Sequence, residues 1–135
     1  MRAREFLGLA VLSLAACGSG GVGISDAERY QQAVDQANQA QATARALGVP
    51  SPCQTNQQCG LLTFMEPTRC PNQTYQVYST ASPSAAAASA AAGQQVTLAQ
   101  QAIALDPNPP QPCPLFPVRA PPTPACVANV CQAAP

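Results

Sequence analysis

Hydrophobic and polar residues alternate in several distinct ways along this chain, and each pattern predicts a different kind of segment. Residues 7–16 form an uncharged, mostly apolar run. Residues 25–47 carry a thin apolar stripe at helical spacing, and residues 82–105 are alanine-rich with larger apolar side chains in their second half. Three short runs, at residues 60–64, 74–80 and 126–131, favour strands instead. The pattern therefore predicts two helices and several short strands behind an apolar leader.

The first predicted helix has clear start and stop signals. Ser25 and Glu28 have the S-x-x-E spacing of a capping box, and Gly48 with Pro50 ends the helical pattern. Its apolar stripe consists mostly of alanine, so three alternatives stay open: the helix docks on the rest of the protein, pairs in a weak coiled coil, or extends into solvent. We assign residues 25–48 as a helical spacer that precedes the folded domain.

The predicted strands form two units. Residues 60–64 and 74–80 are expected to pair with a loop through Cys70 between them, and alternation places Tyr75 and Val77 on one face. At the other end, Ala128-Asn129 would be a two-residue hairpin turn with Cys126 opposite Cys131. Alanine is poorly suited to the left-handed conformation that such a turn requires.

The second predicted helix begins with Ser82 at the cap and Pro83 in the first helical position, and it ends at Leu105. Nine prolines follow in the eighteen residues 107–124, here called the strap. Such a stretch favours polyproline II and cannot join a sheet interior. We expect its apolar residues to pack inward: Leu115, Phe116 and Val118.

The apolar leader has the composition of a secretory signal peptide. Arg2 and Arg4 give a basic start, the apolar run has ten residues, and small residues follow it. A run of this length is too short to span a bilayer, which needs about 20 residues. The sequence therefore predicts export.

The end of the leader resembles the lipobox of bacterial lipoproteins, whose pattern is Leu, small, small, Cys. The matching residues are Leu14-Ala15-Ala16-Cys17. The resemblance implies cleavage after residue 16, a diacylglyceryl thioether on Cys17 and an acylated amine. Several acyl chains on one residue anchor a protein stably. Gly18, rather than aspartate, follows the cysteine, which in this family implies the outer membrane.

Without Cys17, six cysteines remain, and an even number in an exported chain predicts a disulfide framework with fifteen possible pairings. They are Cys53, Cys59, Cys70, Cys113, Cys126 and Cys131. Residues 53–132 also resemble small cysteine-rich exported bacterial proteins of unknown function, which end in Cys-Val-Asn-Gly-x-Cys. This chain has Ala-Asn at residues 128–129 in place of Asn-Gly. The resemblance supplies no activity.

The predicted fold is therefore α+β. It is a small disulfide-stapled domain with short strands, one alanine-rich helix and the proline-rich strap, preceded by a separate N-terminal helix. The predicted organisation is a signal peptide (1–16), a lipidated flexible tether (17–24), the helical spacer (25–48) and a six-cysteine domain (53–135).

Composition narrows the possible functions. The chain has no His, and all six of its basic residues are Arg, so His-dependent and Lys-dependent catalysis are excluded. Its net charge of zero gives no electrostatic attraction for nucleic acid. Only Cys126 and Cys131 have a short zinc-ligand spacing, with no second such pair, so we predict no metal and no cofactor.

The expected function is that of a non-catalytic structural or binding module of the cell envelope. It would be attached to the outer membrane through its lipid, on the periplasmic face or the cell surface, with an envelope protein as its partner. The alternative is an inhibitor of an exported hydrolase, with residues 64–71 as its exposed loop. An enzyme remains possible only if Glu66 and Asp106 converge, since two carboxylates can catalyse glycoside hydrolysis.

Overall fold

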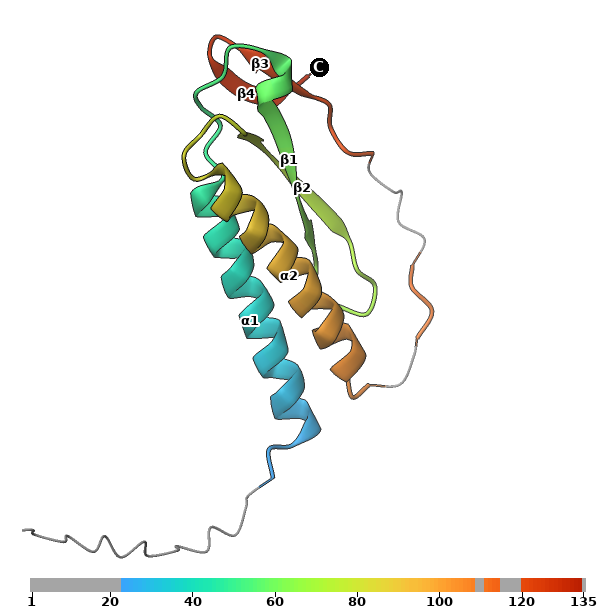
Figure 1. Ribbon diagram of the computed structural model, residues 1–135. Coiled ribbons are helices and arrows are strands. Elements are labelled where there is room, and N and C mark those ends of the chain that lie inside the picture. Colours follow the sequence, from blue (N-terminus) through green and yellow to red (C-terminus); the bar gives the residue numbers. More distant parts are fainter. Residues whose placement is uncertain (1–22, 109–110, 115–119, 135) are drawn as a thin grey trace, which may run out of the picture.

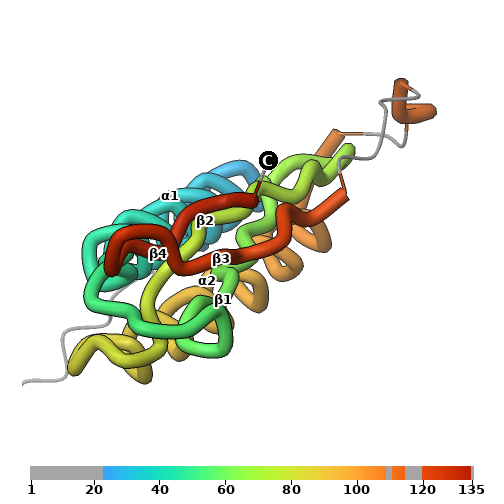
Figure 2. Tube along the Cα trace, turned by 90° about the horizontal axis from the view of Figure 1, so that it is seen from above, coloured from blue at the N-terminus to red at the C-terminus, as the bar shows by residue number. Residues whose placement is uncertain are grey.

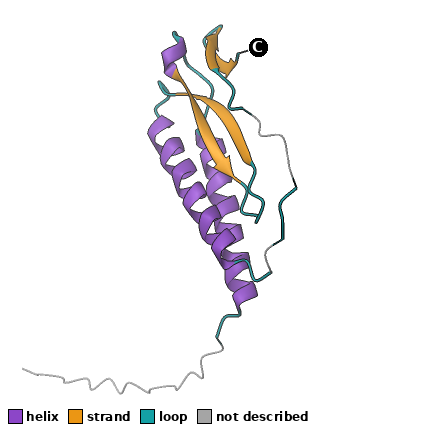
Figure 3. Cartoon of the chain, turned by 90° about the vertical axis from the view of Figure 1, so that its right-hand side faces the viewer, coloured by secondary structure: helices purple, strands orange, loops and turns teal. Residues whose placement is uncertain are grey.

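The computed structural model of the protein describes residues 23–108, 111–114 and 120–134. The order of elements is α1 (Asp26–Leu47), a short 3-10 helix (Asn56–Gln58), β1 (Cys59–Met65), β2 (Gln73–Ser79), α2 (Ala85–Leu105), β3 (Pro124–Val127) and β4 (Val130–Ala133). The helices form one layer and the β1–β2 sheet lies against it (Figures 1 and 3). The predicted α+β class, with its disulfide staples, is confirmed.

The first helix begins where its cap predicts. The Glu28 amide donates to Ser25 Oγ at 3.2 Å, and the Ser25 amide donates to Glu28 Oε2 at 2.7 Å, so the capping box is complete. At the other end the Gly48 amide donates to the Ala44 carbonyl at 2.9 Å. Gly48 is required by a close approach, because a Cβ there would lie 2.6 Å from Leu62 Cδ1.

Of the alternatives for the first helix, docking is the one that the structure shows. The helices α1 and α2 lie side by side along their length (Figure 1), and the buried residues of α1 are all alanines. Such small side chains let two helices approach closely. Ala44 also belongs to the hydrophobic core with Leu62 and Phe64. The helix is therefore part of the domain rather than a spacer in front of it.

The second helix begins later than predicted. It starts at Ala85 with Ser84 as its N-cap, and Ser82 and Pro83 lie in the preceding turns. Local serine contacts explain the shift: the Ser84 amide donates to Ser82 Oγ at 3.3 Å, and Ser84 Oγ donates to the Leu47 carbonyl at 2.7 Å. The end of the helix at Leu105 is confirmed.

The two predicted strands pair as expected. Strands β1 and β2 are antiparallel, in a register that runs from Cys59 opposite Ser79 to Met65 opposite Gln73. The side chains of Leu62 and Phe64 are buried in the core beneath the helices. Gln95 of α2 is also fully buried, although it lies in a polar stretch of the sequence. Its amide group binds both backbone polar groups of Met65.

The predicted C-terminal hairpin is confirmed. Cys126 lies opposite Cys131, and the turn residues Ala128 and Asn129 have φ angles of 51° and 66°. The hairpin packs at one end of the molecule, with β3 near β1 and β4 near β2 (Figure 2). Among the helices of the described residues, none has both the length and the apolar character needed to cross a bilayer.

Candidate functional site

The six predicted cysteines form three disulfides. Cys53 bonds to Cys126 and Cys59 to Cys131, so the chain around the start of β1 is joined to the hairpin. Cys70 bonds to Cys113, which fastens the strap to the β1–β2 loop. The two hairpin cysteines face each other, but each bonds to a cysteine outside the hairpin. Cys17 lies outside the described residues, as do Leu115, Phe116 and Val118, the strap residues expected to pack inward.

Three of these sulfur atoms are close neighbours. The Sγ atoms of Cys53, Cys59 and Cys126 all lie within 4.8 Å of one another, an arrangement that the sequence spacing did not predict. A metal ion would need deprotonated thiolates, and all three sulfurs are held in disulfides. In this oxidised form the cluster is a covalent staple at the hairpin end of the molecule.

The two carboxylates proposed as a catalytic pair have different environments. Asp106 forms an ion pair with Arg69 at 3.1 Å, and its side chain is only 8 % exposed. The backbone N–H of Asn108 is the main cause that lowers the Asp106 pKa, and the Arg69 charge lowers it further. Glu66 is exposed, and no hydrogen bond or ion pair joins it to Asp106 in the described part of the chain.

The loop proposed for an inhibitor is less exposed than expected. Phe64 is fully buried in the core, Pro67 is also buried, and Met65 belongs to β1. Arg69 binds Asp106 and the Asn108 carbonyl. The description of residues 64–71 as an exposed loop is therefore wrong for much of its length, because the strand and the core hold its first half.

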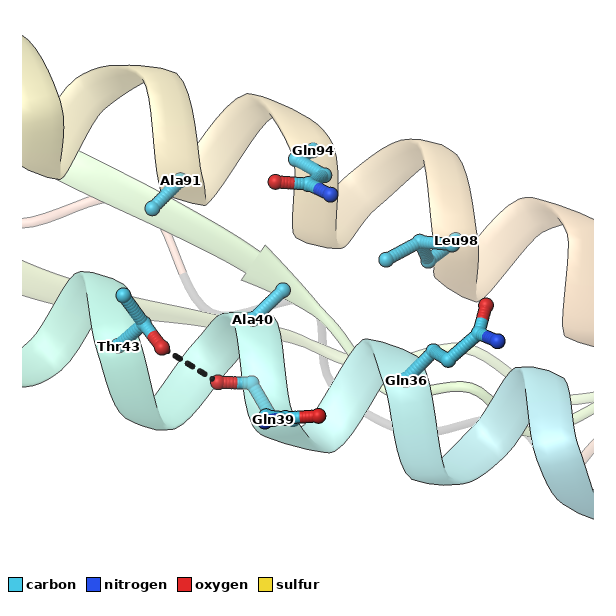
Figure 4. A pocket seen from close by; sticks show the side chains of 7 residues that line it. All are labelled: Gln36, Gln39, Ala40, Thr43, Ala91, Gln94 and Leu98. Atoms are coloured by element: carbon cyan, nitrogen blue, oxygen red, sulfur yellow. Dashed lines mark hydrogen bonds between the residues drawn. The ribbon is translucent and has the colours of Figure 1, made fainter. Parts of the chain in front are cut away.

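A groove runs between the two helices on the surface (Figure 4). It encloses about 270 Å³ and is lined by Gln36, Gln39, Ala40, Thr43, Ala91, Gln94 and Leu98. Thr43 Oγ1 donates to the Gln39 carbonyl at 3.0 Å within α1, so this hydroxyl is already engaged. The groove results from the small alanine side chains where the helices meet, and it brings together no ionisable group.

A larger cavity, of about 490 Å³, lies between β2 and the strap. We call it the strand–strap cleft. Asn72, Gln73, Thr74 and Tyr75 form one side, and Ala120 and Pro122 of the strap form the other. The Cys70–Cys113 disulfide fixes the strap beside the β1–β2 loop, and β3 fixes its other end. The strap is therefore held by a covalent bond at Cys113 and by strand pairing at Pro124.

The pairing of β1 with β2 determines which backbone groups face the cleft. The Glu66 amide donates to the Asn72 carbonyl, and the Thr80 amide donates to the Gln58 carbonyl, so the even-numbered positions carry the ladder bonds. The odd-numbered positions of β2 therefore direct their N–H and C=O groups away from β1. Ser79 follows this rule, since its amide donates to the Val49 carbonyl at 2.8 Å.

Three further odd-numbered positions of β2 remain: Gln73, Tyr75 and Val77. Within the described residues, no hydrogen bond engages their outward backbone groups. The alternation of residues 74–80 places Tyr75 and Val77 on one face of the strand but does not reveal this open edge. The proline content of the strap was the available signal, because it predicts a neighbouring segment that cannot pair with a strand.

Comparisons of the chain with protein-family models, curated proteins and solved structures find no match. The function proposed below is therefore based on the geometry of the strand–strap cleft and on the sequence pattern of the leader.

Proposed function

We propose that the protein is a lipid-anchored, non-catalytic binding module of the bacterial cell envelope. Cys17 carries the lipid, the segment before α1 is a tether, and the disulfide-bonded domain binds an envelope protein. The proposed location is the outer membrane. The three disulfides support an oxidising, exported environment.

The strand–strap cleft is the observation that carries the binding role. It is the larger of the two hollows described above, and it combines open backbone hydrogen-bonding groups with an apolar wall. Preorganised sites lose little conformational entropy when a ligand binds. The Cys70–Cys113 disulfide preorganises this one, since it limits how far the strap can move from the sheet.

The place where α1 begins fits this role. The start of α1 lies at one end of the elongated molecule, and the β3–β4 hairpin lies at the other (Figure 1). A helix of 22 residues spans about 33 Å. In a molecule anchored before α1, the strand–strap cleft lies along the side of the domain, where a partner in the envelope can reach it.

Two measurements test the proposal separately. For the anchor, Cys17→Ser should move the protein out of the detergent-phase membrane fraction. Quantitative retention of this variant in the membrane phase would contradict the lipid anchor.

For binding, a photocrosslinking phenylalanine derivative placed at Tyr75 in the full chain should give a discrete crosslinked species in native envelope. The same group at Gln100, an exposed position on α2, serves as the matched control and should give none. Equal crosslinking at both positions, or none at Tyr75, would contradict a binding role for the cleft.

A further inference from the structure

The open edge of β2 has the chemistry of a docking site for a strand. At every second residue, β2 directs backbone donors and acceptors outward, from Gln73 through Tyr75 to Val77. A strand added at this edge would form hydrogen bonds with groups in this pattern. From Gln73 to Val77 this edge is about 16 Å long at strand spacing. An extended peptide of about five residues would match its length.

Several other outward-facing strand positions in the domain are already engaged. The outward amide of Cys131 in β4 donates to the Pro50 carbonyl at 2.7 Å, and that of Cys126 in β3 donates to Asn56 Oδ1 at 2.9 Å. At the end of β1, Gln95 binds the outward groups of Met65. Exposed edges invite pairing with other chains, and proteins commonly block them. Residues 73–75 of β2 differ because the strand–strap cleft lies along them.

The described residues 120–124 of the strap do not supply the missing strand. Pro121, Pro122 and Pro124 have no backbone N–H, and the Thr123 carbonyl already accepts from the Ala134 amide at 2.8 Å. Ala120 and Pro122 instead present an apolar wall across the cavity from β2. Residues 120–122 therefore lie beside the edge without forming hydrogen bonds to it.

We propose that the strand–strap cleft binds an extended, uncharged peptide segment of a partner protein, which adds to β2 as a third strand. This inference rests on the binding role proposed above and names the partner's chemistry. Among the described residues that line the cleft, none has a charged side chain, and the aromatic hydroxyl of Tyr75 donates to Gln73 Oε1 at 2.9 Å. Backbone hydrogen bonds would give the affinity, and the apolar wall would select small uncharged side chains.

The strap also argues against a second copy of this chain as the occupant. For two β2 edges to pair, each strap would have to leave the position opposite the strand. The Cys70–Cys113 disulfide and the β3–β4 pairing hold both ends of that segment. A slender peptide can enter between the strand and the strap, whereas a folded domain cannot do so without displacing the strap.

The test is amide hydrogen exchange of the full-length protein in detergent micelles, with the synthetic peptide acetyl-Thr-Val-Thr-Val-Thr-amide as the probe. Saturating peptide should slow exchange of the Gln73, Tyr75 and Val77 amides by about tenfold or more, and leave Leu61 and Thr63 on the far edge of β1 unchanged. An analogue methylated at every backbone nitrogen should give no protection.

Two matched variants locate the binding. Val77→Pro removes an outward-facing donor on the open edge of β2 without removing a hydrogen bond to β1, so it should weaken peptide binding by about fivefold to tenfold. Thr63→Pro makes the same change on the far edge of β1 and should leave peptide affinity unchanged. If Val77→Pro does not fold, the methylated analogue remains as the control for backbone pairing.

Several outcomes would overturn the inference: no protection at millimolar peptide, protection of Leu61 and Thr63 instead, or equal binding of the methylated analogue. Protection that rises with protein concentration alone would assign the edge to a second copy and would also overturn it. Crosslinking at Tyr75 without peptide protection would leave the binding role intact and refute only strand addition.

Discussion

Replacing Gln95 with leucine should be among the most damaging single changes in the α2 helix. The Gln95 side chain is fully buried, its Nε2 donates to the Met65 carbonyl at 2.6 Å, and its Oε1 accepts from the Met65 amide at 3.0 Å. The Met65 N–H and C=O both point away from β2, so β2 cannot replace the Gln95 amide as their partner. Gln95→Leu therefore leaves the part-buried N–H and C=O of Met65 without the hydrogen bonds that Gln95 makes to them.

The magnitude follows from those two groups. An unsatisfied buried polar group costs about 1–3 kcal/mol, and the added leucine recovers part of this through its apolar surface. We expect a net loss of about 2–4 kcal/mol in the free energy of unfolding, measured by urea denaturation. Gln94→Leu is the matched control, because Gln94 directly precedes Gln95 in the helix and is exposed. This control should change the free energy of unfolding by less than about 0.5 kcal/mol.

Gln95→Glu tests the mechanism more sharply. Above the unfolded pKa of glutamate, the introduced carboxylate can still accept from the Met65 amide but cannot donate to its carbonyl, and its burial is costly. Its folded pKa should therefore be raised, so the variant should regain stability relative to wild type as the pH falls towards that pKa. A Gln95→Leu variant as stable as wild type, or a Gln95→Glu variant without pH dependence, would contradict the stabilising role given to the Gln95 amide.

Four further outcomes are expected. Ala128→Gly should stabilise the protein by about 0.5–1 kcal/mol in thermal unfolding, because Ala128 is held at a φ of 51°. Ala44→Leu should cost about 1–3 kcal/mol by overpacking the core between the helix and the sheet, as measured by urea denaturation. Asp106→Asn should make the stability of the fold less sensitive to acid, because the pKa of Asp106 is lowered in the folded protein. The stability that this carboxylate contributes is present above its ordinary pKa of 3.8 and is lost as the pH falls through the lowered value. Thiol titration of the denatured, unreduced domain should find no free thiol, and reduction should abolish cooperative unfolding, because disulfides add about 2–4 kcal/mol each to a small core.

Each of these has its own control. Ala46→Gly, at an exposed helical position, should destabilise the protein by about 1 kcal/mol, opposite in sign to the hairpin change. Ala42→Leu, on the exposed side of α1, should be close to neutral, and equal losses at both alanines would contradict a docked helix. An unchanged acid midpoint in Asp106→Asn would contradict the role given to that carboxylate, and two or more free thiols would contradict the framework.

Local signals in the sequence predicted the local structure. The Ser25–Glu28 box, the β-forming residues 74–80 and the spacing of Cys126 and Cys131 each act within a few residues, and the structure confirms their elements. The start of α2 was misplaced because Ser84 is held by the Leu47 carbonyl, 37 residues earlier in the chain. No local pattern contains that contact.

The less predictable features depend on long-range pairing. Gln95 is buried only because the end of β1 comes to lie beside it, and a glutamine in a polar stretch gives no sign of this. Two of the disulfides join cysteines that are 73 and 72 positions apart in the sequence. The presence of six cysteines alone cannot specify such a pairing. The strand–strap cleft likewise requires the register of β1 with β2, since that register decides which backbone groups face outward.

The long reach of two disulfides has a consequence for biosynthesis. A chain delivered N-terminus first presents Cys53 and Cys59 long before their partners Cys126 and Cys131 emerge. Until then the nearest available thiols are each other and Cys70, so early oxidation would form bonds that the mature protein does not contain. Maturation in an oxidising compartment therefore calls for either delayed oxidation or an isomerase that reopens the early bonds, because exchange requires an attacking thiolate. The two disulfides that stabilise the hairpin end of the molecule can therefore form only after the end of the chain has emerged.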